Sequence, residues 1–136
     1  MTTTTTTRRL VVTVSGPDPA LSPNARVHWA KLRKVKAAAR AEAKVLTQAA
    51  MIDTRTPPPW AYADLWNAIT IKRTFYRPTK RVADVDNLEA STKSMADGLA
   101  DALGVNDRIF VWLPSEVIVE RGRREVCFEI EIEVQG

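Results

Sequence analysis

The sequence has one cysteine, Cys127, and one histidine, His28, among its 136 residues. A single cysteine excludes an internal disulfide framework and a multi-cysteine zinc site, and a single histidine excludes a histidine-rich metal site. No apolar run is long enough to span a membrane, and Thr2–Thr7 lacks the apolar character of a signal peptide. These absences predict a cytoplasmic protein in a reducing environment.

Acidic residues are scarce in the first part of the chain. Residues 1–81 hold 15 Lys and Arg against 4 Asp and Glu, a net charge of +11, whereas residues 82–136 hold 5 against 12, a net charge of −7. The basic part predicts a surface that binds a polyanion, and the acidic part predicts carboxylates at a site. Lysines that only solvate a helix are the alternative explanation.

The apolar pattern predicts one domain at residues 9–136, preceded by a disordered threonine-rich tail at residues 1–8. Alternation with a period of two predicts strands, and helical spacing predicts two long helices. The predicted strands are 10–15, 67–76, 109–121 with an interruption at Pro114, and 125–134, and the predicted helices are 27–50 and 88–103. The sequence therefore predicts an α/β or α+β fold, in which two long helices pack on a small mixed β-sheet of about four strands.

Two clusters outside the predicted core have alternative explanations. The glutamates that alternate with apolar residues in 125–134 are expected to form a solvated sheet face rather than a metal site. A group of large apolar residues just before the predicted strand at 67–76 could form a subunit interface or could cover the core. This group consists of Trp60, Tyr62, Leu65 and Trp66.

A pair of carboxylates follows the predicted strand at 67–76. Asp84 and Asp86 occupy alternate positions of an extended segment, so their side chains are expected on one side, where they could share a hard cation. The alternative is a capping box, in which Asp86 and Glu89 bond to the first amides of the following helix. Both explanations are open for Asp86, but a cap leaves Asp84 without a role.

Two charged residues follow this pair. Lys93 comes seven residues after Asp86, which would place it two helical turns further along on the same face. It could neutralise a phosphate there, or it could pair with Glu89 or Asp97 on the surface. Asp107 brings another carboxylate at the far end of the predicted helix. Carboxylates without histidine or cysteine select Mg²⁺ or Mn²⁺, which act where charge develops on phosphoryl oxygens.

The order of these motifs resembles the RusA-like Holliday junction resolvases of bacteria and their phages. The matching residues are Ser22-Pro23-Asn24-x-Arg26-x-His28-Trp29, Asp84-x-Asp86-Asn87-Leu88, Lys93, Asp97-Gly98-Leu99 and Asn106-Asp107. The resemblance covers most of the chain after the threonine tail. The motifs together are far more specific than any one of them, because their order, spacing and predicted strand–loop–helix context agree.

The resemblance implies a homodimeric, Mg²⁺-dependent endonuclease, with Mn²⁺ as a possible substitute, in a bacterial or phage-infected cell. The enzyme would bind a four-way DNA junction and nick two opposing strands to leave ligatable duplexes. The metal-binding carboxylates would be Asp84, Asp86 and Asp107, and Lys93 would assist catalysis through its charge. Binding to the junction would rest mostly on phosphate contacts.

The DNA contacts are predicted from charge and from the resemblance together. The basic helix and the basic segment before Asp84 predict phosphate contacts, and the resemblance places the loop at 24–28 near the DNA or the active site. These residues are Asn24, Arg26, His28, Lys31, Lys34, Arg77, Lys80 and Arg81. A structural role for the loop is the alternative, in which Asn24 closes a turn. Trp29 is expected to pack in the core.

Two departures from the family pattern keep a second function open. Ala90 stands where some relatives have a lysine, and Asn106 stands where the family usually has the first of two aspartates. Asp107 is taken as the ligand, because an amide at the ligand position would remove a negative charge from the metal site. The alternative function is a catalytically silent module that binds branched DNA, with the aspartates in structural roles. A protein–protein adaptor leaves the basic part unexplained.

Overall fold

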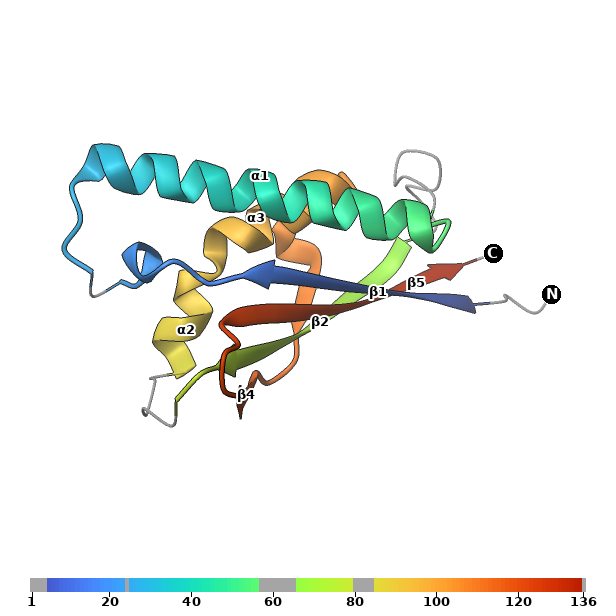
Figure 1. Cartoon of the computed structure of the whole chain (residues 1–136). Coiled ribbons are helices and arrows are strands. Elements are labelled where there is room, and N and C mark those ends of the chain that lie inside the picture. The colour runs from blue at the N-terminus through green and yellow to red at the C-terminus, as the bar shows by residue number, and fades with distance from the viewer. Residues whose placement is uncertain (1–4, 24, 57–65, 80–84, 136) are drawn as a thin grey trace.

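The computed structural model describes residues 5–23, 25–56, 66–79 and 85–135, and within these ranges the chain forms a five-stranded mixed sheet with three α-helices (Figure 1). The strands are β1 (Thr5–Ser15), β2 (Trp66–Arg77), β3 (Phe110–Trp112), β4 (Glu116–Val119) and β5 (Glu125–Gln135). The α-helices are α1 (Trp29–Asp53), α2 (Val85–Ser91) and α3 (Lys93–Leu103), and two short 3-10 helices are η1 (Pro19–Leu21) and η4 (Asp107–Ile109).

The sheet has the strand order β1-β5-β2-β3, and β4 also pairs with β2. β5 is antiparallel to both β1 and β2, whereas β3 and β4 are parallel to β2. β3 pairs with β2 at Ile69, and β4 pairs with it as far as Arg77, so the two short strands follow each other along one edge of the sheet. β2, the two helices α2 and α3, and β3 therefore form a βαβ unit.

The core lies between one face of the sheet and the helices. The largest fully buried side chains come from alternate positions of β1, β2 and β5 and from one face of α3. They are Leu10, Val12, Val14, Ile69, Ile71, Phe75, Met95, Leu99, Leu103, Phe128, Ile130 and Ile132. α1 packs against α3 and β1, and it buries Ala39 and Ala43. The fold class predicted from the apolar pattern is confirmed.

Several boundaries differ from those predicted. β1 begins at Thr5 and pairs with β5 from there, so residues 5–8 belong to a strand and not to the disordered tail. The second predicted helix is two helices, because Thr92 at φ −98° and ψ 6° interrupts it. The fifth strand arises because the predicted segment at 109–121 divides into β3 and β4. No helix of the described residues is long and apolar enough to cross a membrane.

Gly98 allows α3 to approach α1 closely. A Cβ atom at this position would collide with the carbonyl oxygen of Arg40 and would lie 2.9 Å from the Cβ of Ala43. We expect Gly98→Ala to lower the free energy of unfolding by about 1–3 kcal/mol, because the two helices must separate. Urea denaturation would measure the change. A glycine-to-alanine change inside an uncrowded helix stabilises by about 0.5–1 kcal/mol, so an increase in stability would contradict this packing.

Candidate functional site

The carboxylate motif lies at the junction between β2 and α2. Asp86 is exposed in the first turn of α2, which begins at Val85. Asp86 is therefore helical, and the prediction that it alternates with Asp84 along an extended segment is wrong for Asp86. The predicted capping box is also wrong, because Asp86 lies inside the helix and the Glu89 carboxylate is bonded elsewhere. Asp84, Lys80 and Arg81 lie outside the described residues.

A buried ion pair fixes α2 against the sheet. Arg73 of β2 is buried on the helix-covered face, and its Nη2 donates to the Glu89 carboxylate at 2.6 Å. The Ser115 hydroxyl donates to the same carboxylate at 2.7 Å, and Arg73 Nη1 donates to Thr92 Oγ1 at 3.3 Å. The Arg73 guanidinium also lies 4.1 Å from the centre of the Trp112 ring. Burial lowers the pKa of Arg73, and Glu89 opposes that shift. The network sets the position of the helix that carries Asp86.

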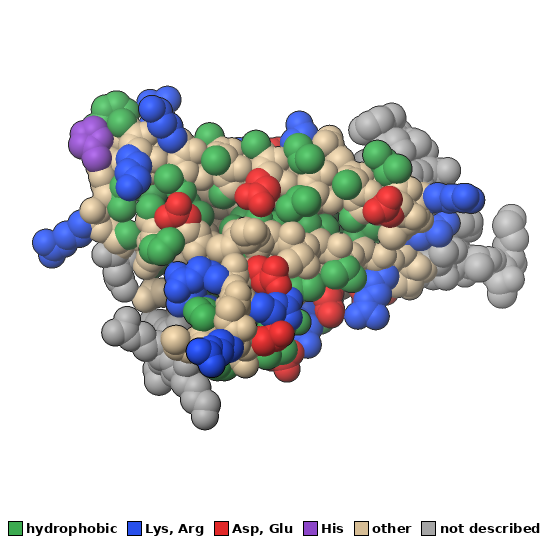
Figure 2. Space-filling view, in the orientation of Figure 1, with side chains coloured by type: hydrophobic (Ala, Val, Ile, Leu, Met, Phe, Trp, Pro, Cys, Tyr) green, Lys and Arg blue, Asp and Glu red, His purple; other side chains and the backbone are tan. Residues whose placement is uncertain are grey.

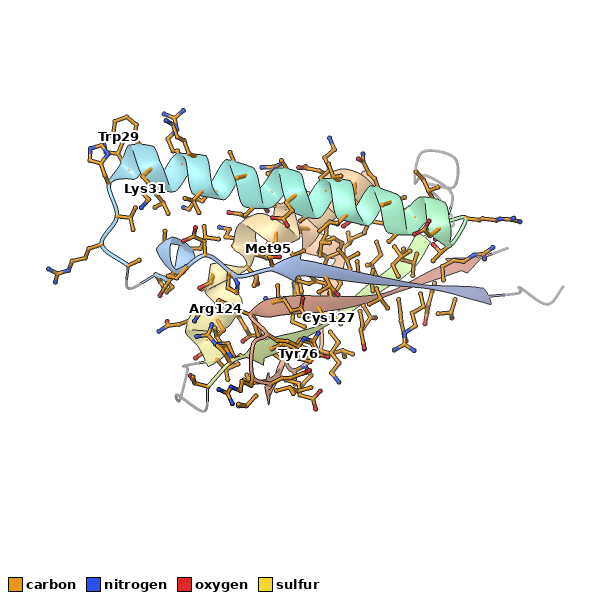
Figure 3. The ribbon with its side chains drawn as sticks, viewed as in Figure 1. Trp29, Lys31, Tyr76, Met95, Arg124 and Cys127 are labelled. Atoms are coloured by element: carbon orange, nitrogen blue, oxygen red, sulfur yellow. The ribbon has the colours of Figure 1, made fainter. Side chains whose placement is uncertain are left out.

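Two arginines line a cleft beside the start of α2. The cleft has a volume of about 260 Å³ and lies between η1, α2 and the ends of β2 and β5. Its lining includes Arg77, Arg124, Asn87 and Ser91, and Asp18 at its rim accepts a hydrogen bond from the Ala20 amide at 2.9 Å. Figure 3 labels Arg124 beside α2.

The electrostatics of this arginine cleft favour an anion. Burial and the like charge of Arg124 both lower the pKa of Arg77. Within the part of the chain that the structure describes, neither Arg77 nor Arg124 makes an ion pair with a carboxylate. Two guanidinium groups that repel each other, and that make no ion pair among the described residues, gain from binding a phosphate, which can accept hydrogen bonds from both.

Arg124 is not among the DNA-binding residues predicted from the sequence, because it lies in the basic run Arg121–Arg124, which is typical of a solvated turn. Its neighbour Arg123 is half-buried and has its charge neutralised by glutamates, whereas Arg124 is exposed. Arg123 pairs with Glu120 at 2.7 Å and stacks 3.6 Å from the centre of the Tyr76 ring. Only the antiparallel pairing of β5 with β2, which aligns Glu125 with Tyr76, brings Arg124 towards Arg77. No local signal in the sequence separates the two arginines.

Lys93 does not share a continuous helix with Asp86. It is the first residue of α3, beyond the interruption at Thr92, so the predicted two-turn spacing on one helical face is wrong. Lys93 is exposed and lines a separate cleft of about 380 Å³ together with Lys36, Ser94 and Asp97. Its predicted role in catalysis stays a prediction.

Asp107 lies at the other end of the βαβ unit. It opens η4, where the Asn106 side chain accepts a hydrogen bond from the Arg108 amide at 3.0 Å and so caps the turn. Three residues later, Phe110 pairs with Ile69 near the beginning of β2. Asp86 follows the end of β2, and its neighbour Asn87 lines a cleft with Arg77.

The separation of the two carboxylates can be estimated from the strand between them. Ile69 and Arg77 are eight residues apart in β2, which corresponds to about 26 Å at about 3.3 Å per residue. Asp107 and Asp86 therefore stand towards opposite ends of this strand, and one chain does not bring them together. Among the described residues, no group of three His, Cys, Asp or Glu side chains could hold a metal ion. The predicted set of Asp84, Asp86 and Asp107 is not assembled in the described part of one chain.

The loop before α1 has a structural role at His28 and an exposed aromatic surface at Trp29. His28 Nδ1 accepts a hydrogen bond from the Ala30 amide at 3.2 Å and caps the helix. Trp29 is 64% exposed, stacks on the His28 ring and lies 5.8 Å below the Arg33 guanidinium, so the prediction that it packs in the core is wrong. The helical spacing of apolar residues could not predict the burial of Trp29, because the apolar stripe of α1 begins only at Leu32.

Basic side chains surround the beginning of α1 (Figure 2). Arg26, Lys31, Arg33 and Lys34 are all exposed there, and Figure 3 labels Lys31 next to Trp29. Asn24 lies outside the described residues. This surface suits contact with a nucleic-acid backbone, because cationic side chains flank an aromatic ring that can stack.

No protein-family model matches this chain. A protein of Xylella fastidiosa (strain Temecula1), described only as uncharacterized, is 41% identical over 103 residues, which make up 76% of this chain and 63% of that protein. This chain thus spans less than two thirds of the length of that relative. Among solved structures, the OmpA-like domain of FopA1 from Francisella tularensis has 13% identity and a TM-score of 0.35, with coverage of 97% of this chain and 77% of that one. A score this low supports no inference about function.

Proposed function

We propose that this chain is a RusA-like, Mg²⁺-dependent endodeoxyribonuclease that resolves Holliday junctions by paired nicks. The observation that carries the proposal is the placement of the acidic motif. Asp86 lies in the first turn of α2, and the next residue, Asn87, lines the cleft that contains Arg77 and Arg124. A carboxylate beside a pair of arginines suits a phosphodiester substrate, because the cations hold the phosphate that the carboxylate would otherwise repel.

The arginine cleft would position the DNA backbone at the site. Arg77 and Arg124 supply planar donors that can bind phosphate oxygens in a bidentate manner, and Asn87 and Ser91 add polar groups to the same lining. Neither guanidinium must give up an ion pair within the described residues in order to bind, so the cleft is prepared for an anion. Within the described residues of one chain, Asp86 and Asp107 stand towards opposite ends of β2.

The basic surface at the start of α1 would extend the DNA contact. Lys31, Lys34 and Arg26 are exposed and can neutralise phosphates, and Trp29 can stack on an unpaired base. Most of these contacts carry no sequence information, so binding is expected to depend strongly on salt and only weakly on sequence.

Removal of a cleft arginine is expected to weaken junction binding. We expect Arg77→Gln or Arg124→Gln to reduce the affinity for a synthetic four-way junction by about ten-fold and to reduce the salt slope by about one phosphate contact. Fluorescence anisotropy over a series of salt concentrations would measure both quantities. The control is Arg9→Gln, because Arg9 already pairs with Glu129 at 3.4 Å on the open face of the sheet. Equal losses in all three variants would contradict a specific phosphate site in the cleft.

A nicking assay tests the proposed activity directly. The protein is incubated with a mobile four-way junction of synthetic DNA, with Mg²⁺, with Mn²⁺ and with a chelator, over a range of salt. Symmetric paired nicks that require the divalent ion would support the proposal. An intact junction under every condition, despite tight binding, would overturn it.

Two observations favour a second candidate function, the catalytically silent module that binds branched DNA. Asp86 and Asp107 are separated within one chain, and Asn106 has a structural role as the cap of η4. A silent module would bind the junction without a divalent ion and leave it intact. Chelation separates the two functions, because it abolishes nicking in the first and changes nothing in the second.

A further inference from the structure

A large aromatic side chain stands exposed at the beginning of α1. Trp29 is the first residue of this helix and is 64% exposed, although an indole gains more from burial than most side chains do. Its ring stacks on His28 with 5.6 Å between ring centres, and the Arg33 guanidinium lies 5.8 Å from its centre. Figure 3 shows Trp29 at the end of the helix, away from the sheet. The two contacts leave most of the ring in water, where a flat ligand can reach it.

A recess lies beside the indole on one side of α1. It has a volume of about 470 Å³, and its lining follows the helical spacing of Trp29, Ala30, Arg33, Lys34 and Ala37. Ala30 and Ala37 each contribute only a methyl group, which leaves space between the indole and the two long basic side chains. A nucleobase suits this space, because its flat face can stack on the indole while its phosphate stays near the cations.

The charge around this recess favours a nucleotide over an apolar partner. The exposed basic residues there make no ion pair with a carboxylate among the described residues, and they are Arg26, Lys31, Arg33 and Lys34. The first acidic residue of α1 is Glu42, about two helical turns beyond Lys34. An apolar protein surface would leave these cations without a counter-charge, whereas a nucleotide supplies a base for the ring and a phosphate for the cations.

Neighbouring hollows connect this recess to the arginine cleft. Lys34 lines both the recess and a hollow of about 440 Å³ between α1, η1 and the end of β1. Asp18 lines that hollow and also the arginine cleft. Trp29 and Arg124 lie towards the same end of the molecule in Figure 3. A DNA strand with one phosphate in the arginine cleft can therefore continue along this surface to α1.

We infer that Trp29 and its recess bind an unpaired nucleobase, and that this base site makes the chain prefer branched and single-stranded DNA over intact duplex. The choice of DNA as the ligand rests on the proposed function, whereas the base site itself requires no nicking. Phosphate contacts do not distinguish a junction from a duplex, because both have the same backbone. Bases inside a duplex are paired and stacked, and a base leaves the stack at least cost where pairing is interrupted. Stacking on Trp29 therefore supplies the difference in affinity.

Binding in the presence of a chelator tests the base site without any nicking. Fluorescence anisotropy compares a single strand, a four-way junction and a duplex of related sequence. We expect Trp29→Ala to reduce the affinity for the single strand and the junction by about ten-fold and that for the duplex by less than about two-fold. Trp29→Phe keeps an aromatic ring and should retain most of the affinity. The control is Ile52→Ala, because Ile52 is a large apolar residue that is 77% exposed at the other end of α1.

Removal of the base instead of the indole gives a second test. A series of junctions is prepared, each with one abasic site at a different position from the branch point. We expect one position at which the abasic site weakens binding by the wild-type protein about as much as Trp29→Ala does. The Trp29→Ala protein should bind that junction and the intact one equally, because both changes remove the same contact. Losses that add at every position would overturn the inference.

The outcomes separate failure of the base site from failure of the proposed function. Equal losses for junction and duplex in Trp29→Ala would overturn the base site, because the ring would then serve the backbone contact or the fold. Unchanged affinities together with a lower molar mass in light scattering would assign Trp29 to a protein contact and would also overturn it. A wild-type protein that nicks junctions remains a nuclease in both cases. A protein that selects junctions through Trp29 but never nicks them supports the base site, and it overturns the nuclease.

Discussion

Asp86→Asn is expected to lower the rate of junction nicking by at least about 100-fold, a loss similar to that on removal of one preorganised hydrogen-bond donor in other active sites. Asparagine has nearly the same shape as aspartate but carries no negative charge, so it removes the proposed role in catalysis without removing volume. Asp86 is exposed in the first turn of α2, and the fold does not depend on burying it. We therefore expect the affinity for the junction to change by less than about two-fold.

The matched control is Asp53→Asn. Asp53 is also an exposed helical aspartate, but it lies at the far end of α1, away from the arginine cleft. The Asp53→Asn variant should nick junctions at the wild-type rate. Single-turnover nicking, together with anisotropy for binding, measures both quantities on the same junction. Wild-type nicking by Asp86→Asn would remove Asp86 from the active site, and equal losses in both variants would point to a general effect of charge.

Glu89→Gln is expected to lower the free energy of unfolding by about 3 kcal/mol, at the lower end of the range for breaking a buried ion pair. The substitution leaves the Arg73 guanidinium buried without its counter-charge, and the Nε of Arg73 already lacks a hydrogen-bond partner among the described residues. The Glu89 side chain is 29% exposed, and screening by solvent moderates the loss of stability. Urea denaturation followed by tryptophan fluorescence would measure the change.

An exposed ion pair on the same sheet serves as the control for Glu89. Arg9 and Glu129 pair at 3.4 Å with side chains 60% and 36% exposed, so Glu129→Gln should change the stability by less than about 1 kcal/mol. Hydrogen exchange gives a second readout, because loss of the Arg73 anchor should increase exchange in α2 more than in α3. Equal effects of the two substitutions would show that Arg73 and Glu89 do not act as an anchor.

Most of the fold could be predicted from the sequence because its apolar periodicity is clear. The alternation in 125–134 marks β5, and the apolar stripe of the predicted helix at 88–103 lies in the core. This stripe consists of Leu88, Met95, Leu99, Ala102 and Leu103. The interruption at Thr92 was not predicted, because the apolar stripe continues across it. At this position the Thr92 hydroxyl donates to the Glu89 carbonyl oxygen at 2.8 Å and accepts from Arg73 at 3.3 Å, and the contact with Arg73 has no local signal in the sequence. The prediction that Trp29 is buried was wrong because it rested on the size of the apolar ring. The first turn of α1, where Trp29 lies, extends past the core.

The candidate site was predictable in its residue types but not in its assembly. The acidic motif and its position between a strand and a helix are visible in the sequence. Arg77 and Arg124 line the same cleft because of the register of β5 against β2, and no local sequence pattern predicts that register. The distance between Asp86 and Asp107 depends on the parallel pairing of β3 with β2. Both facts come from strand order, which is a property of the whole sheet.

The central position of β5 has a consequence for synthesis of the protein on the ribosome. β5 follows β1 to β4 in the sequence, yet it lies between β1 and β2 and forms hydrogen bonds with both. The edges of β1 and β2 that pair with β5 therefore stay unpaired in the nascent chain until β5 leaves the exit tunnel. Chaperone binding to the unfinished chain is expected to persist until Glu125 and the residues after it have emerged, and to end when β5 closes the sheet.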